Sequence, residues 1–148
     1  MNIFILEDDF LQRRQLVHII KSIGKEEHYH YEKVFSTSKP EELLNVAQEV
    51  GEHQIYFLDI QINGNDLAGL EVAREIRKKD RYCSIVFISS FPNYMWKSYS
   101  YSVSALDFIV KVHEREKLQH AISKNLKIVA ENCKRTIAQE SFFSSKLS

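Results

Sequence analysis

The sequence predicts an α/β fold in which a five-stranded parallel sheet is doubly wound, with helices on both of its faces. Two observations lead to this fold class. Short apolar runs alternate five times with segments whose apolar residues recur at helical spacing. Runs such as 55–58 and 85–88 have no polar position, which is typical of strands that helices cover on both sides. No repeat or linker interrupts this alternation before about residue 132, so a single domain is expected.

The first half of the chain supplies two strands and two helices in order. Asn2–Leu6 is an apolar run that predicts a strand, and the next helix is expected to end at Gly24 after the stripe Leu16, Ile19, Ile20 and Ile23. The aromatic, alternating segment Tyr29–Phe35 predicts the second strand. Pro40 in a first turn and Ser38 as its cap predict the second helix, with the stripe Leu43, Val46, Ala47 and Val50.

The second half continues the same alternation. It predicts, in order, a strand over 55–58, a helix over 68–79, a strand over 84–88, a short helix over 92–100 and a strand over 105–110. One long amphipathic helix follows, with the stripe Leu118, Ile122, Leu126, Val129, Cys133 and Ile137. The Ser-rich end, Ser141–Ser148, is expected to be frayed.

Composition excludes several classes of protein. Apolar residues make up 44% of the 148, which is enough for a core and argues against wholesale disorder. The longest apolar runs are far shorter than the roughly 20 residues of a membrane helix, and the acidic N-terminus is no signal peptide. Two cysteines cannot build a disulfide framework. We therefore expect a cytoplasmic protein without a membrane partner.

The zero formal charge hides an asymmetry between the two halves. Residues 1–66 carry 6 basic and 12 acidic residues, a net of −6, and residues 67–148 carry 14 and 8, a net of +6. A basic half can attract nucleic acid or an acidic protein. Because no stretch has five consecutive basic residues, a solvated surface is the favoured interpretation.

Polar side chains follow four of the predicted strands at the points where the strands end. They are Glu7 and Asp8, Asp59, Ser89 and Lys111. The carboxyl ends of parallel strands meet at one edge of a sheet, where ligands of such folds bind. Taken singly, the acidic residues and Ser89 could cap helices or turns, and Lys111 could be a surface lysine. Their joint placement is much harder to obtain by chance.

Three clustered carboxylates repel one another unless a divalent cation neutralises them. An all-oxygen ligand set suits Mg²⁺ better than zinc. A carboxylate beside Mg²⁺ can attack phosphorus and form an acyl phosphate. In this arrangement the Lys111 ammonium would offset charge on the phosphoryl oxygens, and the Ser89 hydroxyl would donate a hydrogen bond.

The sequence resembles the receiver domain of two-component response regulators over residues 1 to about 130. The matching pieces are IFILED at 3–8, YFLD at 56–59, VFISS at 86–90 and ALDFIVK at 105–111, and the separations of 30 and 52 residues from Asp59 to Ser89 and Lys111 also suit the family. The resemblance implies a flavodoxin-like (βα)5 fold. It also implies a protein that is no enzyme beyond its own phosphotransfer and slow autodephosphorylation.

The resemblance assigns a role to each matching residue. Asp59 would be the phosphoacceptor, and Ser89 and Lys111 would follow the phosphoryl group. Mg²⁺ would be held by Glu7, Asp8, Asp59 and the backbone carbonyl of Gln61, with Asp8 favoured over Glu7 as the direct ligand. Phe108, three residues before Lys111, matches the aromatic switch position, so Ser89 and Phe108 would together form the switch.

The phrases YFLDI and SALDFIVK look most like the subgroup that carries a LytTR DNA-binding domain, the quorum-sensing regulators of Gram-positive bacteria. This implies a sensor histidine kinase as phosphoryl donor, control of transcription, and DNA contact only through an output domain outside this chain. We expect residues 1–131 to be the receiver domain and 132–148 a helical extension toward that output domain. Homodimerisation on phosphorylation is expected through the fourth helix, the fifth strand and the last helix. Tyr94, Trp96, Tyr99 and Tyr101 crowd the fourth helix and its exit, a pattern that fits a protein-interaction face and equally fits partial packing into the core.

The chain departs from the family at two places. The loop after Asp59 lacks the usual proline, and Val112 stands where a proline in a cis bond usually follows the lysine. A cis bond before a residue other than proline is costly, so a trans bond is expected before Val112.

Two other functions remain as alternatives. One is a Mg²⁺-dependent phosphohydrolase with an aspartate nucleophile, but such enzymes commonly carry a second Asp where this chain has Gln61. The other is a phosphorylation-independent pseudo-receiver, which the retained Glu7, Asp8, Asp59 and Lys111 disfavour.

Overall fold

The computed structural model describes residues 1–147, with side chains through residue 144, and contains one five-stranded parallel sheet in that part of the chain. The strands lie in the order β2-β1-β3-β4-β5. The element bounds are β1 Asn2–Leu6, α1 Phe10–Glu27, β2 Lys33–Thr37, α2 Pro40–Val46, β3 Gln54–Asp59, α3 Ala68–Lys79, β4 Ser84–Ser89, α4 Tyr94–Ser100, β5 Asp107–Val110 and α5 Arg115–Leu147. The predicted fold class is confirmed.

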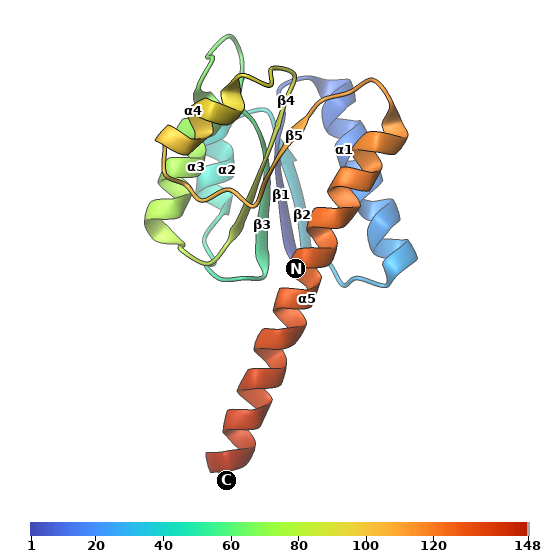
Figure 1. The fold of residues 1–148 in the computed structure, drawn as a ribbon, viewed down its shortest axis with the longest axis vertical. Helices are drawn as coiled ribbons and strands as arrows, with labels where there is room; N and C mark the ends of the chain where they lie inside the picture. The colour runs from blue at the N-terminus through green and yellow to red at the C-terminus, as the bar shows by residue number, and fades with distance from the viewer. Residues whose placement is uncertain (148) are drawn as a thin grey trace.

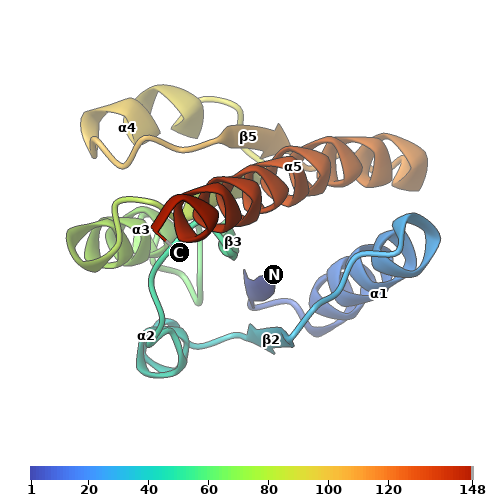
Figure 2. The ribbon, with the colours of Figure 1, turned by 90° about the horizontal axis from the view of Figure 1, so that it is seen from below.

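The sheet lies between two layers of helices. Helices α1 and α5 cover one face, and α2, α3 and α4 cover the other (Figures 1 and 2). Successive residues of a strand point to opposite faces, so each central strand contributes to two cores. Phe4, Tyr56 and Phe87 are buried on the α3 side, whereas Ile5, Phe57 and Ile88 are buried on the side of α1 and α5. This explains why the strand sequences are apolar throughout.

The end of α1 differs from the sequence prediction. The helix does not end at Gly24 but continues to Glu27, where His28 adopts a left-handed conformation with φ of 59°. Gly24 is needed for a different reason, because a Cβ there would lie 2.4 Å from a ring carbon of Tyr31. The Tyr31 hydroxyl donates a hydrogen bond to the Ile20 carbonyl at 2.9 Å, so this residue packs on α1, and β2 begins only at Lys33.

Helix α2 also differs in its details. Pro40 opens it as predicted, but its N-cap is Lys39, with no side-chain cap bond, rather than Ser38. The Lys39 N–H instead donates to the Thr37 hydroxyl oxygen at 3.1 Å. Val50 was expected on the buried stripe, but the helix ends at Val46 and Val50 is 54% exposed.

Helix α5 is 33 residues long, and its far end projects away from the sheet (Figure 1). Its first half is anchored by the buried Leu118, Ile122, Leu126 and Val129. The expected frayed end is wrong for residues 141–147, which are helical, while residue 148 lies outside the described residues. Past the sheet, the Cys133 thiol and the Thr136 hydroxyl both contact Glu52, and Ile137 and Phe143 are exposed beyond them.

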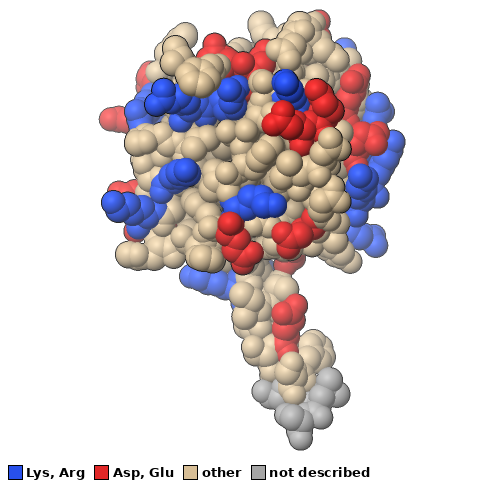
Figure 3. Space-filling model, turned by 180° about the vertical axis from the view of Figure 1, so that it is seen from behind, with Lys and Arg blue, Asp and Glu red and all other residues tan. Residues whose placement is uncertain are grey.

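The surface carries both signs of charge. On the face drawn in Figure 3, basic and acidic side chains are interspersed rather than gathered into one field. None of the helices within residues 1–147 combines the length and the apolar character that a membrane span requires.

Candidate functional site

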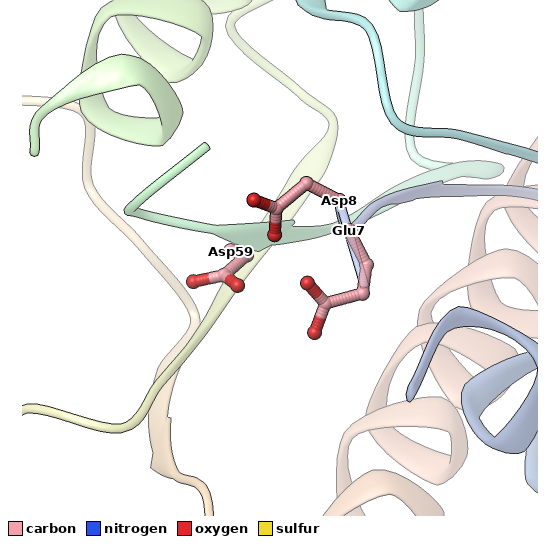
Figure 4. Close-up of side chains that lie close together, drawn as sticks. All are labelled: Glu7, Asp8 and Asp59. Carbon is pink, nitrogen blue, oxygen red and sulfur yellow. The ribbon is translucent and has the colours of Figure 1, made fainter. Parts of the chain in front are cut away.

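Three carboxylates converge where β1 and β3 end. Leu6 and Leu58 are partners in the parallel register of these neighbouring strands, so the residues that follow each strand come together at one edge. Glu7, Asp8 and Asp59 each offer an oxygen within 4.8 Å of the others, and Figure 4 shows their carboxylates lying close together. The predicted convergence of strand ends therefore holds for the acidic residues.

Lys111 reaches the same cluster from the end of β5. Its Nζ donates to Glu7 Oε1 at 2.6 Å, to Asp59 Oδ2 at 2.7 Å and to Gln12 Oε1 at 2.8 Å. Glu7 is 1% exposed and Asp59 is 7% exposed. An ammonium between two buried carboxylates offsets part of their repulsion, which is the electrostatic condition for keeping both in one place.

The proximity of these charges changes their protonation. Burial, together with the nearby Asp59 carboxylate, raises the pKa of Glu7 to about 8, although Lys111 opposes the shift. Burial acts to lower the pKa of Lys111, but its bonds to Asp59 and Glu7 outweigh burial and raise that pKa above its ordinary value. For Asp8, burial is outweighed by hydrogen bonds, chiefly from the Asn63 N–H at 2.9 Å, so its pKa is lowered.

The residues present fit a hard divalent cation. They line a cavity of about 260 Å³ whose walls also include Gln61, Ser90 and Lys111. Every donor on the acidic side is a carboxylate oxygen, and oxygen ligands are those that Mg²⁺ prefers. A cation there would neutralise the charge that Lys111 offsets only in part.

Ser89 and its neighbour Ser90 occupy different positions. Ser89 is buried, and its Oγ accepts a hydrogen bond from the Phe91 N–H at 3.1 Å. Ser90 is exposed and lines the acidic cavity. The structure therefore places Ser90, which the sequence prediction did not include, on the wall of this cavity, whereas Ser89 is the residue at the predicted separation from Asp59.

Phe108 lies on β5 at the far side of the site. Its ring packs against Phe87 with centroids 6.4 Å apart and borders a cavity of about 440 Å³ that Met95 and Tyr99 of α4 also line. Open volume beside a half-buried ring leaves room for a second rotamer. The peptide bond before Val112 is trans, as expected.

Gln61 connects the site to α4. Its backbone N–H donates to Asp59 Oδ1 at 3.3 Å. Its side-chain Nε2 donates to the Tyr94 hydroxyl at 3.1 Å and to Asp66 Oδ1 at 3.3 Å. This bridge joins residues 33 positions apart and was not foreseen from the sequence.

Gly69 holds the end of β3 and the loop that follows it close to α3. Its N–H donates to the Ile60 carbonyl at 2.9 Å. A Cβ at Gly69 would lie 2.0 Å from the Asp59 carbonyl oxygen and 2.7 Å from the Ile60 Cα. The backbone of Asp59 can therefore rest against the helix only because residue 69 has no side chain.

This fold and this cluster define a signalling domain of one known class. The family model of the response regulator receiver domain matches residues 3–123, and the chain belongs to this family. Among curated proteins, it is 39% identical over 111 residues to accessory gene regulator protein A of Staphylococcus epidermidis and to that of Staphylococcus aureus. The match covers 75% of this chain and 46% of each relative, so the chain spans about half the length of these relatives.

Solved structures agree with this assignment. The response regulator TrrA from Thermotoga maritima, in complex with Mg²⁺ and BeF, is 27% identical with a TM-score of 0.63, over 84% of this chain and 98% of that one. The response regulatory domain of mrkE from Klebsiella pneumoniae is 25% identical with a TM-score of 0.68, over 88% and 99% of the two chains.

Proposed function

We propose that this receiver domain takes a phosphoryl group from a sensor histidine kinase onto Asp59. The observation that carries the proposal is the Asp59 carboxylate itself, held by Lys111 at 2.7 Å and flanked by Glu7 and Asp8. In the transfer an Asp59 oxygen attacks phosphorus, the P–N bond to the kinase histidine breaks, and the imidazole leaves with the bonding electrons. Lys111 offsets the phosphoryl charge, and Ser89 or Ser90 supplies a hydroxyl donor.

Mg²⁺ is the cofactor that this proposal requires. Glu7, Asp8, Asp59 and the carbonyl oxygen of Gln61 would hold it. When bound, it supplies positive charge beside the acceptor oxygen and the phosphoryl group. The acidic cavity and the Mg²⁺–BeF complex of TrrA support the choice of ion.

Replacing Asp8 with asparagine should weaken Mg²⁺ binding by about tenfold or more, because it removes one of the three carboxyl groups that would face the ion at close range. The shape of the side chain is retained, so the fold should be unaffected. Titration of Mg²⁺ followed by NMR shifts of the residues around the cavity measures this. Asp66→Asn, on the rim of the same cavity, is the matched control and should change affinity little. Equal Mg²⁺ affinity of Asp8→Asn and the parent would rule out Asp8 as a ligand.

The phosphoryl group would act through the surface of α4 and β5. Ser89 would turn toward the phosphoryl oxygens, and Phe108 would change rotamer into the cavity beside α4. Beyond this switch, the chemistry would be limited to self-phosphotransfer from small donors and slow autodephosphorylation. The half-buried ring of Phe108 and the volume next to it support this route.

In its cellular setting, we propose a cytoplasmic regulator of quorum-controlled transcription. The similarity to accessory gene regulator protein A supports this, and so does the greater length of these relatives. Residues 1–131 would be the receiver domain. Residues 132–148 would lead toward an output domain, and DNA would be contacted only by that domain.

Incubation with acetyl phosphate and Mg²⁺, followed by intact mass, tests the function. We expect a gain of one phosphoryl group that is absent in Asp59→Asn and without Mg²⁺. No gain in the parent would favour a phosphorylation-independent interaction module. Many turnovers on small phosphate esters would favour a phosphohydrolase instead.

Phosphorylation should promote a homodimer through α4, β5 and α5. Trp96 is 79% exposed and Tyr99 is 71% exposed on α4, with ring centroids 6.3 Å apart, and exposed aromatic pairs are typical of interface cores. Sedimentation with and without beryllofluoride should show a dimer only in the loaded state. A monomer in both states at high concentration contradicts the prediction, and a dimer that survives Trp96→Ala with Tyr99→Ala moves the interface elsewhere.

A further inference from the structure

A chain of contacts leads from one oxygen of Asp59 to helix α4. The two carboxylate oxygens of Asp59 accept hydrogen bonds from different groups. Oδ2 accepts from the Lys111 ammonium, and Oδ1 accepts from the Gln61 N–H at 3.3 Å. The side chain of that same Gln61 donates to the Tyr94 hydroxyl at 3.1 Å. Tyr94 is the first residue of α4 and packs edge-on against Phe91, with ring centroids 6.0 Å apart.

Among the residues with described side chains, Lys111 contacts Oδ2 and no ammonium group contacts Oδ1, so Oδ1 is the Asp59 oxygen open to a metal ion or a phosphoryl group. Either occupant would compete with the Gln61 N–H for this oxygen. The backbone of Gln61 would then move relative to Asp59, and this movement would disturb the hydrogen bond from its side chain to Tyr94. The tie to α4 therefore belongs to the resting arrangement of the site.

We propose that the Gln61–Tyr94 hydrogen bond holds α4 in its resting position. The bond is released when Asp59 is loaded, that is, when it carries a phosphoryl group or the mimic beryllofluoride with Mg²⁺. Tyr94 is thus a positioning residue, which acts on the site only through Gln61. This inference rests on the proposed phosphoacceptor function of Asp59. It adds a second route to α4, separate from Ser89 and Phe108.

A bond that exists only in the resting state opposes loading, so its removal should favour loading. The net value of one neutral hydrogen bond corresponds to a change of about 2- to 10-fold in an equilibrium constant. Tyr94→Phe keeps the ring against Phe91 and removes only the hydroxyl. We expect it to tighten binding of beryllofluoride with Mg²⁺ by that factor.

Trp96 provides the readout. It is the single tryptophan of the chain and lies two residues after Tyr94 on α4. In the metal-free state, the Trp96 emission of Tyr94→Phe should already be shifted toward that of the loaded parent. Beryllofluoride titrations in saturating Mg²⁺, followed by Trp96 emission and by NMR, give the affinities. Thermal unfolding checks that the variant is folded.

A double-mutant cycle separates this coupling from a merely structural role. Gln61→Met removes the amide and keeps the length, and it should have the same effect as Tyr94→Phe, with no further gain in the double variant. Tyr82→Phe is the matched control, since Tyr82 is 62% exposed at the opposite edge of the sheet, and it should bind as the parent does. Unchanged or weaker binding by Tyr94→Phe, or additive effects in the cycle, would overturn the inference while leaving the phosphoacceptor intact. A parent that binds no beryllofluoride would overturn both.

Discussion

Replacement of Lys111 by alanine should lower the free energy of unfolding of the metal-free protein by about 3 kcal/mol, because one partner of a buried charge cluster is removed. The Lys111 ammonium contacts Glu7 and Asp59, whose side chains are 1% and 9% exposed. Without it, Glu7 and Asp59, when both are ionised, face each other with no countercharge. The variant should still accept phosphate, since metal and nucleophile carry the transfer, but it should signal poorly.

The stability lost in Lys111→Ala should depend on pH in a defined direction. The pKa of Glu7 is already raised from 4.5 to about 8 in the folded parent, so the folded state binds a proton more tightly than the unfolded state does. The stability that this proton contributes is present below pH 4.5 and is lost as the pH rises to about 8. Removing Lys111 removes an effect that lowers this pKa. The variant should therefore be closest to the parent at low pH and should diverge from it across this window.

Urea unfolding at several pH values, with and without Mg²⁺, measures both effects. Mg²⁺ should stabilise Lys111→Ala more than the parent, because the ion replaces the missing charge. Lys124→Ala is the matched control, since Lys124 is 62% exposed, lies 3.8 Å from Asp107, and should cost less than about 1 kcal/mol. If Lys111→Ala is as stable as the parent at pH 8 without Mg²⁺, the electrostatic account of the cluster is wrong.

Replacement of Gly69 by alanine should destabilise the protein by about 3 kcal/mol, at the upper end of what overpacking usually costs. The added Cβ would lie 2.0 Å from the Asp59 carbonyl oxygen, which belongs to the backbone and cannot rotate away. In the interior of an ordinary helix, replacing glycine by alanine stabilises the protein by up to about 1 kcal/mol. The effect expected at residue 69 therefore has the opposite sign. Because relief requires a shift of the Asp59 backbone, phosphorylation should also slow.

Thermal unfolding and the rate of acetyl phosphate labelling check this prediction. Glu75→Ala on the same helix is a suitable control, because Glu75 is exposed and forms a surface ion pair with Lys78. A Gly69→Ala protein that is more stable than the parent, with an unchanged labelling rate, would show that the close approach does not position Asp59.

Several elements were predictable because their sequence signals are local. Helix α3 spans Ala68–Lys79 as its periodicity indicates, and β3 ends at Asp59 where the apolar run stops. The three carboxylates and Lys111 were also predictable as a group, since strand ends in a parallel sheet meet at one edge. These features depend on spacing and on fold class alone.

The remaining features depend on contacts between distant parts of the chain. Gly24 resembles a helix end in sequence, but it faces the Tyr31 ring and α1 continues past it. Ser89 is buried, with its Oγ accepting from the Phe91 N–H, whereas the adjacent Ser90 is exposed and lines the acidic cavity. The hydrogen bond from Gln61 to Tyr94 requires the loop after β3 to lie against α4, and the spacing of apolar residues in the sequence does not predict this contact.

The length of α5 has a mechanical consequence. At about 1.5 Å per residue, its 33 residues make a rod roughly 50 Å long, and the part beyond Thr136 measures about 16 Å. The end packed on the sheet acts as a fulcrum, and the free part as a lever arm. A tilt of about 10° at the fulcrum, which needs only small shifts of packed side chains, displaces the tip by about 3 Å over that length. The helix would thus amplify a subtle rearrangement near β5 into a movement large enough to remake or break contacts at its far end.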